Sequence, residues 1–267
     1  LGTGNYNPKT ARFYTDLGLF TADQAIGRDV AAVFEQLRGA APADGRGIAE
    51  VLAAPFTLQQ TVIELIEAEL REAQAGRPAR ILAKMNSLND AAIIAALYRA
   101  SQAGVQIDLV VRGVTTIKPG VPGLSENIRV RSVLGRYLEH SRVFSFHAGG
   151  EGKVYIASAD WMARNTTRRI ETAVPIKDPH LKSYLQTLLD SYLRDNAGAL
   201  ELRPDGSSET SGPEEALPWL WAAATDTAYR AAALDAVRAL GLQAPAEVLP
   251  VLAGLVGLRG AVEPLRK

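Results

Sequence analysis

A regular alternation of short apolar runs with helical patterns, between residues 57 and 194, constrains the fold more than any other feature. Apolar residues at helical spacing predict helices over 57–75 and 90–103, and an Asp-Pro pair predicts a third over 178–194. Short apolar runs predict strands over 80–84, 105–112, 128–134, 143–146 and 153–157. Strands that alternate with helices in this way are typical of an α/β fold, so we expect a mixed, largely parallel sheet flanked by helices.

Single residues mark where these helices begin and end. Thr57 is followed three residues later by Gln60, which predicts a capping box at the start of the first helix. Gly76 and Gly104 are expected to end the first two helices, because glycine readily adopts the backbone conformation that closes a helix. A shorter helix is predicted over 28–37.

Changes of composition divide the chain into three parts. Residues 1–47 open with small and polar side chains and close on a stretch that contains glycine and proline, whereas residues 48–205 hold the α/β alternation. The stretch 203–215 is rich in Gly, Ser, Pro and acidic residues and predicts a flexible linker. The last part, 206–267, continues in short helical patterns, and we assign it no role.

The overall composition narrows the classes of function. The 29 lysines and arginines balance 29 acidic residues, so we expect no nucleic-acid partner, and an anion would be held by local cationic clusters. The chain has no cysteine, which excludes disulfides, thiolate metal sites and a cysteine nucleophile. No apolar run reaches the ~18 to 20 residues that span a bilayer, and no signal peptide is visible. We expect a cytoplasmic protein, with peripheral contact to a membrane left open.

The opening run, residues 1–16, is dense in small residues and in amide and hydroxyl side chains, and it carries Lys9 and Arg12. That mixture suits a backbone that approaches an anion closely and clamps it. Its Gly-Thr-Gly-Asn-Tyr at 2–6 has an echo in Ala-Ser-Ala-Asp-Trp at 157–161, since both combine a hydroxyl between small residues with a polar acceptor and an aromatic ring. Because the run starts without a methionine, we expect the chain to begin inside a domain.

His140 and Arg142 form a second candidate element before the echo. On a strand, side chains two residues apart point to the same face, and the arginine fork can bind a phosphate through two hydrogen bonds. An imidazole can act as a nucleophile or as a general acid. Together with the 157–161 motif, this element resembles half of the phospholipase D superfamily site, in which two halves meet around one phosphoryl group.

A wider set of ordered motifs over residues 1–205 resembles polyphosphate kinases. The motifs are Gly-Thr-Gly-Asn-Tyr-Asn-Pro-Lys-Thr-Ala-Arg at 2–12, Tyr-Thr-Asp at 14–16, Ala-Lys-Met-Asn at 83–86, Val-Arg-Gly at 111–113, the run 119–131, Tyr-Leu-Glu-His-Ser-Arg at 137–142, and Ser-Ala-Asp-Trp-Met at 158–162 with Arg164 and Asn165. The resemblance implies reversible transfer of the terminal phosphate of ATP to polyphosphate through a phosphohistidine upstream of Leu1. It also implies Mg²⁺ bound with ATP, no prosthetic group and a homo-oligomeric full-length protein, and it leaves this chain alone without activity.

The same resemblance assigns roles to single residues. Tyr14 is expected to pack against the ATP base, and Arg112 and His140 to contact the nucleotide phosphates, with His140 as the catalytic residue. The further candidate phosphate contacts are Lys9, Arg12 and Arg142, and no resident metal ligand is assigned. Residues 1–47 would then be the remnant of a first phospholipase D-like catalytic domain, and residues 48–205 the second.

Two other functions stay open. A phospholipase D-like phosphodiesterase is disfavoured because Arg142 stands where that superfamily usually has lysine, and because residues 143–148 contain no acid. A non-catalytic anion-binding fragment is compatible with a nucleophile outside the chain. The candidate side chains also have structural alternatives, which are core packing for Tyr14, a solvated strand end for Arg112, a satisfied structural histidine for His140 and surface charges for Lys9 and Arg12.

Overall fold

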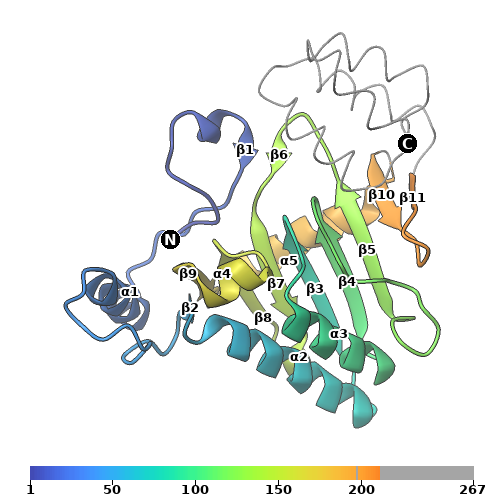
Figure 1. The fold of residues 1–267 in the computed structure, drawn as a ribbon, viewed down its shortest axis with the longest axis horizontal. Coiled ribbons are helices and arrows are strands. Elements are labelled where there is room, and N and C mark those ends of the chain that lie inside the picture. The colour runs from blue at the N-terminus through green and yellow to red at the C-terminus, as the bar shows by residue number, and fades with distance from the viewer. Residues whose placement is uncertain (197, 211–267) are drawn as a thin grey trace.

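The computed structural model describes residues 1–196 and 198–210, and Figure 1 shows a sheet with helices on its faces and a leading segment that projects from one end. The α-helices are α1 Gln24–Leu37, α2 Leu58–Gln74, α3 Ala91–Gln102, α4 Ala163–Thr167 and α5 Pro179–Arg194. The helical tail predicted for 206–267 lies, from residue 211 on, outside the described residues. None of the helices in the described ranges is long and apolar enough to cross a membrane.

In the described part of the chain, nine strands form one mixed sheet, in the order β11-β10-β5-β4-β3-β7-β8-β9-β2. Their bounds are β2 Leu52–Ala54, β3 Arg80–Met85, β4 Gln106–Val111, β5 Ile128–Val133, β7 Arg142–Phe146, β8 Lys153–Ala157, β9 Glu171–Pro175, β10 Ala199–Leu202 and β11 Ser208–Thr210. Two short strands, β1 Tyr14–Thr15 and β6 Leu138–Glu139, pair with each other in parallel outside this sheet. The mixed α/β class and the five predicted strands are confirmed.

The predicted majority of parallel strands is wrong. Among the eight strand pairings of the large sheet in the described part of the chain, β3–β4 and β4–β5 are parallel and the other six are antiparallel. Helix α3 provides the crossover that a parallel pair requires between β3 and β4. Between β7 and β8, by contrast, a short turn over 147–152 uses Gly149, Gly150 and Gly152 at positive φ, and it reverses the chain into a hairpin.

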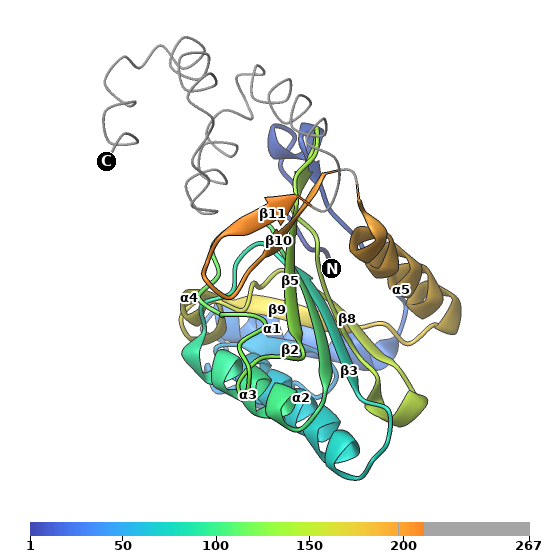
Figure 2. The ribbon, with the colours of Figure 1, turned by 90° about the vertical axis from the view of Figure 1, so that its right-hand side faces the viewer.

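The sheet lies between two helical layers. Helices α2 and α3 cover one face and α5 covers the other, as Figure 2 shows. Successive side chains of the central strand β3 enter opposite cores, because a strand alternates its faces. Ile81 is buried with Ile66 of α2, whereas Leu82 is buried with Leu189 of α5. This alternation places Lys84, two residues after Leu82, on the α5 side of the sheet.

Two local predictions are corrected. Thr57 does precede α2, but its hydroxyl accepts the backbone N–H of Ala53 at 3.0 Å and makes no bond to the helix start, so no capping box forms. Gln60 instead pairs with a residue of the next helical turn. The linker predicted for 203–215 is, through residue 210, a turn followed by β11, and Gly206 at φ 87° allows the chain to reverse there.

The leading segment, residues 1–19, folds back onto the sheet. The backbones of Leu1 and Leu19 exchange two hydrogen bonds, at 3.1 and 2.8 Å, and close the base of a loop. At the far side of that loop, β1 pairs with β6, so that Tyr14 lies beside Leu138. Figure 1 shows the segment at one end of the sheet, with β1 next to β6. The opening run therefore lies next to His140 in space, although the two are far apart in the sequence.

Candidate functional site

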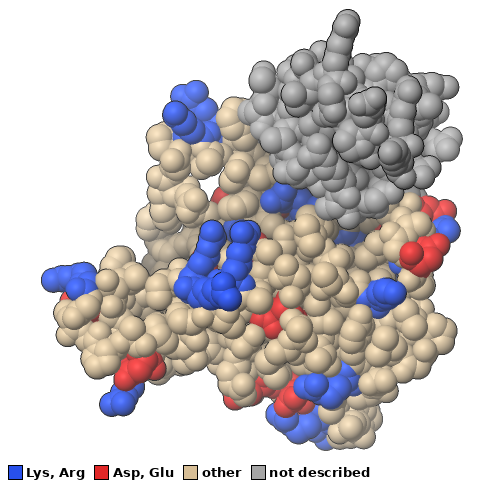
Figure 3. Space-filling model, in the orientation of Figure 1, with Lys and Arg blue, Asp and Glu red and all other residues tan. Residues whose placement is uncertain are grey.

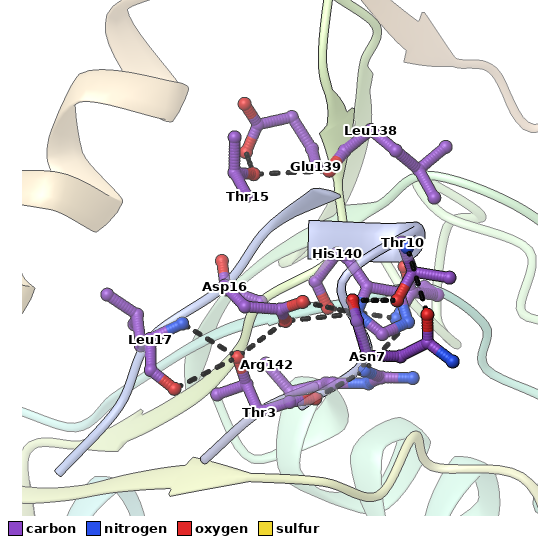
Figure 4. Close-up of polar contacts among 12 residues, drawn as sticks. Thr3, Asn7, Thr10, Thr15, Asp16, Leu17, Leu138, Glu139, His140 and Arg142 are labelled. Atoms are coloured by element: carbon purple, nitrogen blue, oxygen red, sulfur yellow. Dashed lines mark hydrogen bonds and ion pairs between the residues drawn. The ribbon is translucent and has the colours of Figure 1, made fainter. Parts of the chain in front are cut away.

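His140 lies in the connection between β6 and β7, under the leading segment. Its Nδ1 lies 2.9 Å from Oδ1 and 3.0 Å from Oδ2 of Asp16, as Figure 4 shows. The ring centroids of Tyr14 and His140 are 4.6 Å apart. The β1–β6 pairing accounts for both contacts, because it places Tyr14 and Asp16 beside the strand that leads into His140. The His140 side chain is 15 % exposed, so the ring remains accessible.

Gly4 and Thr3 hold the Asp16 carboxylate in place. A Cβ on Gly4 would overlap that carboxylate, so only glycine permits the approach, and the Thr3 hydroxyl donates to Oδ1 at 2.7 Å. Partial burial alone would raise the pKa of Asp16, but hydrogen bonds to His140 and Thr3 and the charges of His140 and Arg142 lower it below its ordinary value. Asp16 is therefore ionised at neutral pH and can orient the imidazole through Nδ1.

Arg142 joins the two echoed motifs. Its Nε and Nη2 lie 3.1 and 3.2 Å from the two carboxylate oxygens of Asp160, in the second motif. Its Nη1 donates to the backbone oxygen of Thr3, in the first motif, at 2.7 Å, and lies 3.1 Å from His140 Nε2. The resemblance between the two motifs thus corresponds to a contact in space. Arg142 is 8 % exposed and its three guanidinium nitrogens are occupied by protein groups. It therefore holds the two motifs and His140 in position from the buried side of the site.

Arg112 joins the same site through Asn86. Asn86 follows the end of β3 and Arg112 follows the end of β4, so the parallel pairing of these strands brings them together. Nε and Nη2 of Arg112 donate to Asn86 Oδ1 at 2.9 and 2.7 Å, and Asn86 Nδ2 donates to the backbone oxygen of His140 at 3.2 Å. Burial lowers the pKa of Arg112, against the opposing effect of nearby Asp160, and the guanidinium stays charged.

Asp160 connects this cluster to α4. Its Oδ1 accepts the backbone N–H of Asn86 at 2.7 Å, and its own N–H donates to Asn165 Oδ1 at 3.0 Å. Helix α4 therefore begins beside the site. Its exposed positions include Arg164, and Arg168 follows its last residue. Figure 3 shows basic side chains gathered over α4, and within the described ranges Arg164 and Arg168 form no ion pair.

Lys9 and Arg12 lie apart from this cluster. Lys9 precedes a short 3-10 turn, Thr10–Arg12, and Arg12 ends it, in the exposed part of the leading segment. Within residues 1–196 and 198–210, no hydrogen bond or ion pair joins their side chains to His140, to Arg112 or to an acidic group. The structure thus brings Tyr14 and Arg142 each into contact with His140, adds Arg112 through Asn86, and leaves Lys9 and Arg12 exposed to solvent.

Two side chains of the site received no role in the reading of the sequence. Asp16 belonged to a quoted motif, yet its contact with His140 spans 124 positions and depends on the β1–β6 pairing. Asn86 had a usable signal, because it follows a buried strand just as Arg112 does, and the ends of parallel strands are where α/β sheets place ligand contacts.

The chain's own residues do not form a resident metal site in the part that the structure describes. No group of three or more histidine, aspartate or glutamate side chains is placed to hold an ion there. Magnesium usually takes one or two carboxylates together with phosphate oxygens and water. In this site the Asp16 carboxylate is already engaged by His140 and Thr3, so these residues do not fit a protein-bound magnesium ion.

Comparisons with known proteins give a consistent result. Residues 51–217 match the family model described as polyphosphate kinase C-terminal domain 2, and residues 1–43 match polyphosphate kinase C-terminal domain 1. A polyphosphate kinase of Burkholderia cenocepacia is 56 % identical over 207 residues, which cover 77 % of this chain and 30 % of that protein. One of Synechocystis is 53 % identical over 207 residues, which cover 78 % and 28 %.

A solved structure gives the same result for the fold. The crystal structure of a polyphosphate kinase from Porphyromonas gingivalis superposes with a TM-score of 0.76 at 42 % identity, covering 80 % of this chain and 33 % of that one. The chain thus spans about a third or less of the length of these proteins.

Proposed function

The chain belongs to the polyphosphate kinase family, and from that premise we propose that it supplies one side of a site for reversible phosphate transfer between ATP and polyphosphate. The observation that carries the proposal is the contact of Tyr14, Asp16 and Arg142 with a single imidazole, His140. All four residues come from the motifs that resemble the family. Their convergence is what a phosphate-handling site requires, because phosphoryl transfer depends mainly on positioning and charge neutralisation.

In the proposed site, each side chain has a separate task. The Tyr14 ring, half-buried against His140, packs on the adenine side of the nucleotide. Arg112 offers its charge to the nucleotide phosphates from the end of β4, where Asn86 fixes its direction. The exposed Arg164 and Arg168 beside α4 add positive charge for the polyanionic product. ATP carries its own magnesium ion, which neutralises charge on the phosphates when it is bound.

His140 acts in this proposal as the group that faces the transferring phosphate. Nδ1 of His140 lies within hydrogen-bond distance of the ionised Asp16 carboxylate, and Arg142 Nη1 lies 3.1 Å from Nε2 and 3.2 Å from Nδ1. An imidazole oriented by a carboxylate can take up a proton and return it to a departing oxygen. We propose that the phosphorylated histidine is a different one, outside this chain. Arg142 is a positioning residue in this account.

A chimeric enzyme tests the proposal directly. In the Burkholderia cenocepacia polyphosphate kinase, the matching 207-residue segment is replaced by that of this chain, and ATP-dependent polyphosphate synthesis is measured. We expect synthesis by the chimera and at least a ~10²-fold loss of kcat with His140→Ala, the size typical for a lost acid–base group. His180→Ala, which alters an exposed histidine of α5, is the control and should keep full activity.

Other outcomes of the same experiment would decide against the proposal. Unchanged synthesis with His140→Ala would remove this residue from the mechanism. Cleavage of a phosphodiester by the unmodified chimera without ATP would favour the phospholipase D-like alternative.

A further inference from the structure

A buried lysine contacts the residues on both sides of His140. Lys84 of β3 is 2 % exposed, and its Nζ lies 2.9 Å from Oγ and 3.0 Å from the backbone oxygen of Ser141. The same Nζ lies 3.5 Å from Oε2 of Glu139. Because Glu139 and Ser141 immediately flank His140, a single ammonium group restrains the backbone of the candidate catalytic residue at both ends.

The Glu139 carboxylate gathers contacts from three other parts of the fold. Its Oε2 accepts the Tyr192 hydroxyl of α5 at 2.5 Å and the Thr15 hydroxyl of β1 at 3.1 Å, besides pairing with Lys84. The Tyr192 ring centroid lies 5.0 Å from Lys84 Nζ, within the range of a cation–π contact. The cluster Lys84–Glu139–Tyr192 therefore connects the sheet, α5 and the leading segment at the point where β6 ends.

The Lys84–Glu139 ion pair is not expected to add much to the free energy of unfolding. A buried ion pair can often be replaced by apolar residues without loss of stability, because both charges must leave water. Burial lowers the pKa of Lys84 to about 8, against the opposing effect of Glu139, so the group still carries its proton at neutral pH. Burial and the bond to Glu139 raise the pKa of Tyr192, which keeps its hydroxyl a donor.

The two partners in the His140–Asp16 contact depend differently on the cluster. The Asp16 carboxylate accepts the Thr3 hydroxyl within the leading segment, whereas the residues on both sides of His140 contact Lys84 directly. The cluster also reaches the leading segment at Thr15, next to Asp16. A change at Lys84 can thus move His140 relative to Asp16 while leaving the Thr3–Asp16 bond in place.

We propose that Lys84 is a positioning residue that holds the 139–141 backbone so that the His140 ring stays against Asp16 and Tyr14. The inference rests on the proposed function only in treating His140 as functional. Its test needs no substrate, so a failure of ATP–polyphosphate transfer and a failure of this inference can be told apart.

The histidine side chains of the chain provide the readout. There are three, His140, His147 and His180, so a proton–nitrogen NMR spectrum of the ring signals can be assigned with single His→Gln variants. Lys84→Met removes the ammonium group and keeps most of the side-chain volume. We expect it to shift the His140 ring signals and to leave the other two in place. His147 follows the opposite end of β7, and His180 lies in the first turn of α5.

Lys153→Met is the matched control, because Lys153 lies on strand β8 of the same sheet with an exposed side chain. Lys153 pairs with Phe146, at the end of β7 opposite His140, so its substitution should leave the His140 signals in place. A folded Lys84→Met protein whose His140 signals equal those of the unmodified chain would overturn the proposal.

If Lys84→Met does not fold, Tyr192→Phe removes a single hydroxyl from the cluster and keeps the ring. We expect a smaller displacement of the same His140 signals. Unchanged His140 signals in this folded variant would refute the positioning role.

Discussion

Arg142 connects the two similar motifs, 2–6 and 157–161, within one site. Its guanidinium contacts the first motif at the Thr3 backbone oxygen and the second at Asp160. We predicted from spacing that Arg142 would share a face with His140, and the 3.1 Å contact between Nη1 and Nε2 confirms their proximity. His140 lies outside both strands, in the connection between β6 and β7. The contact therefore forms in that connection and not along one face of a strand.

The contribution of Asp16 to the stability of the protein should fall as the solution becomes acidic. Its folded-state pKa lies below the ordinary value of 3.8, so its stabilising contribution is present above pH 3.8 and is lost as the pH falls through the lower value. We expect the stability advantage of the unmodified chain over Asp16→Asn to shrink between about pH 6 and about pH 3. Urea unfolding at both pH values measures that difference.

Asp44→Asn, in an exposed loop, controls for the loss of one surface carboxylate. An advantage over Asp16→Asn that stays constant or grows in acid would show that the Asp16–His140 contact does not form in solution.

The candidate site was predictable where a residue carries its own local signal. Tyr14, His140 and Arg142 stand in dense motifs, and Arg112 stands at a strand end before glycine. The clearest failure is Lys84. It belongs to a quoted motif but received no role, because nothing local reveals that it contacts residues 55 or more positions away around His140. Side chains whose role depends on long-range pairing have no local signal.

At the level of elements, two aspartate caps invite comparison. Asp90 caps α3 by accepting the backbone N–H groups of Ala92 and Ile93, and its other oxygen accepts the Gln59 and Thr166 side chains, both at 2.6 Å. Asp178 caps α5 in the same way but is exposed, and among the described residues its side chain has no such further partners. The two helices thus begin with the same bond under different burial.

We therefore expect the two cap deletions to differ in cost. Asp178→Ala should lower the free energy of unfolding by about 1 kcal/mol, the usual cost of a lost cap. Asp90→Ala should lower it by about 3 kcal/mol, because buried donors of neighbouring elements also lose their acceptor. Urea unfolding followed by circular dichroism measures both. Equal losses would contradict the account that Asp90 ties α4, and with it the Asp160 motif, to α3.

Local and long-range information explain which elements were predictable. The helices that begin after Asp90 and Asp178 follow from residues within one turn, and their bounds are confirmed. Strands β1, β2, β6, β9, β10 and β11 were missed. They are short, and all except β11, which pairs with β10 alone, take hydrogen bonds from a partner far along the chain. Strand direction failed for the same reason, since a pattern of apolar residues does not specify which neighbour a strand will pair with.

At the scale of the whole molecule, the site exists because the leading segment folds over the end of the large sheet. Leu1, Leu17 and Leu19 pack against the core on the α5 side, and the β1–β6 pairing seats Tyr14 and Asp16 beside His140. The division at 47 and 48 between two catalytic domains remains a prediction. Two parts of the chain that are far apart in sequence thus contact the same imidazole, that of His140. The central claim is that they form one site around it.

The most direct measurement follows the three histidine ring signals of the chain during titration with ATP and magnesium, and separately with inorganic polyphosphate. The account predicts that the His140 signals shift saturably with either ligand while His147 and His180 stay in place, and that Arg112→Met weakens the response to ATP. Equal shifts of all three histidines, or a response that Arg112→Met leaves unchanged, would contradict a nucleotide-phosphate site at His140.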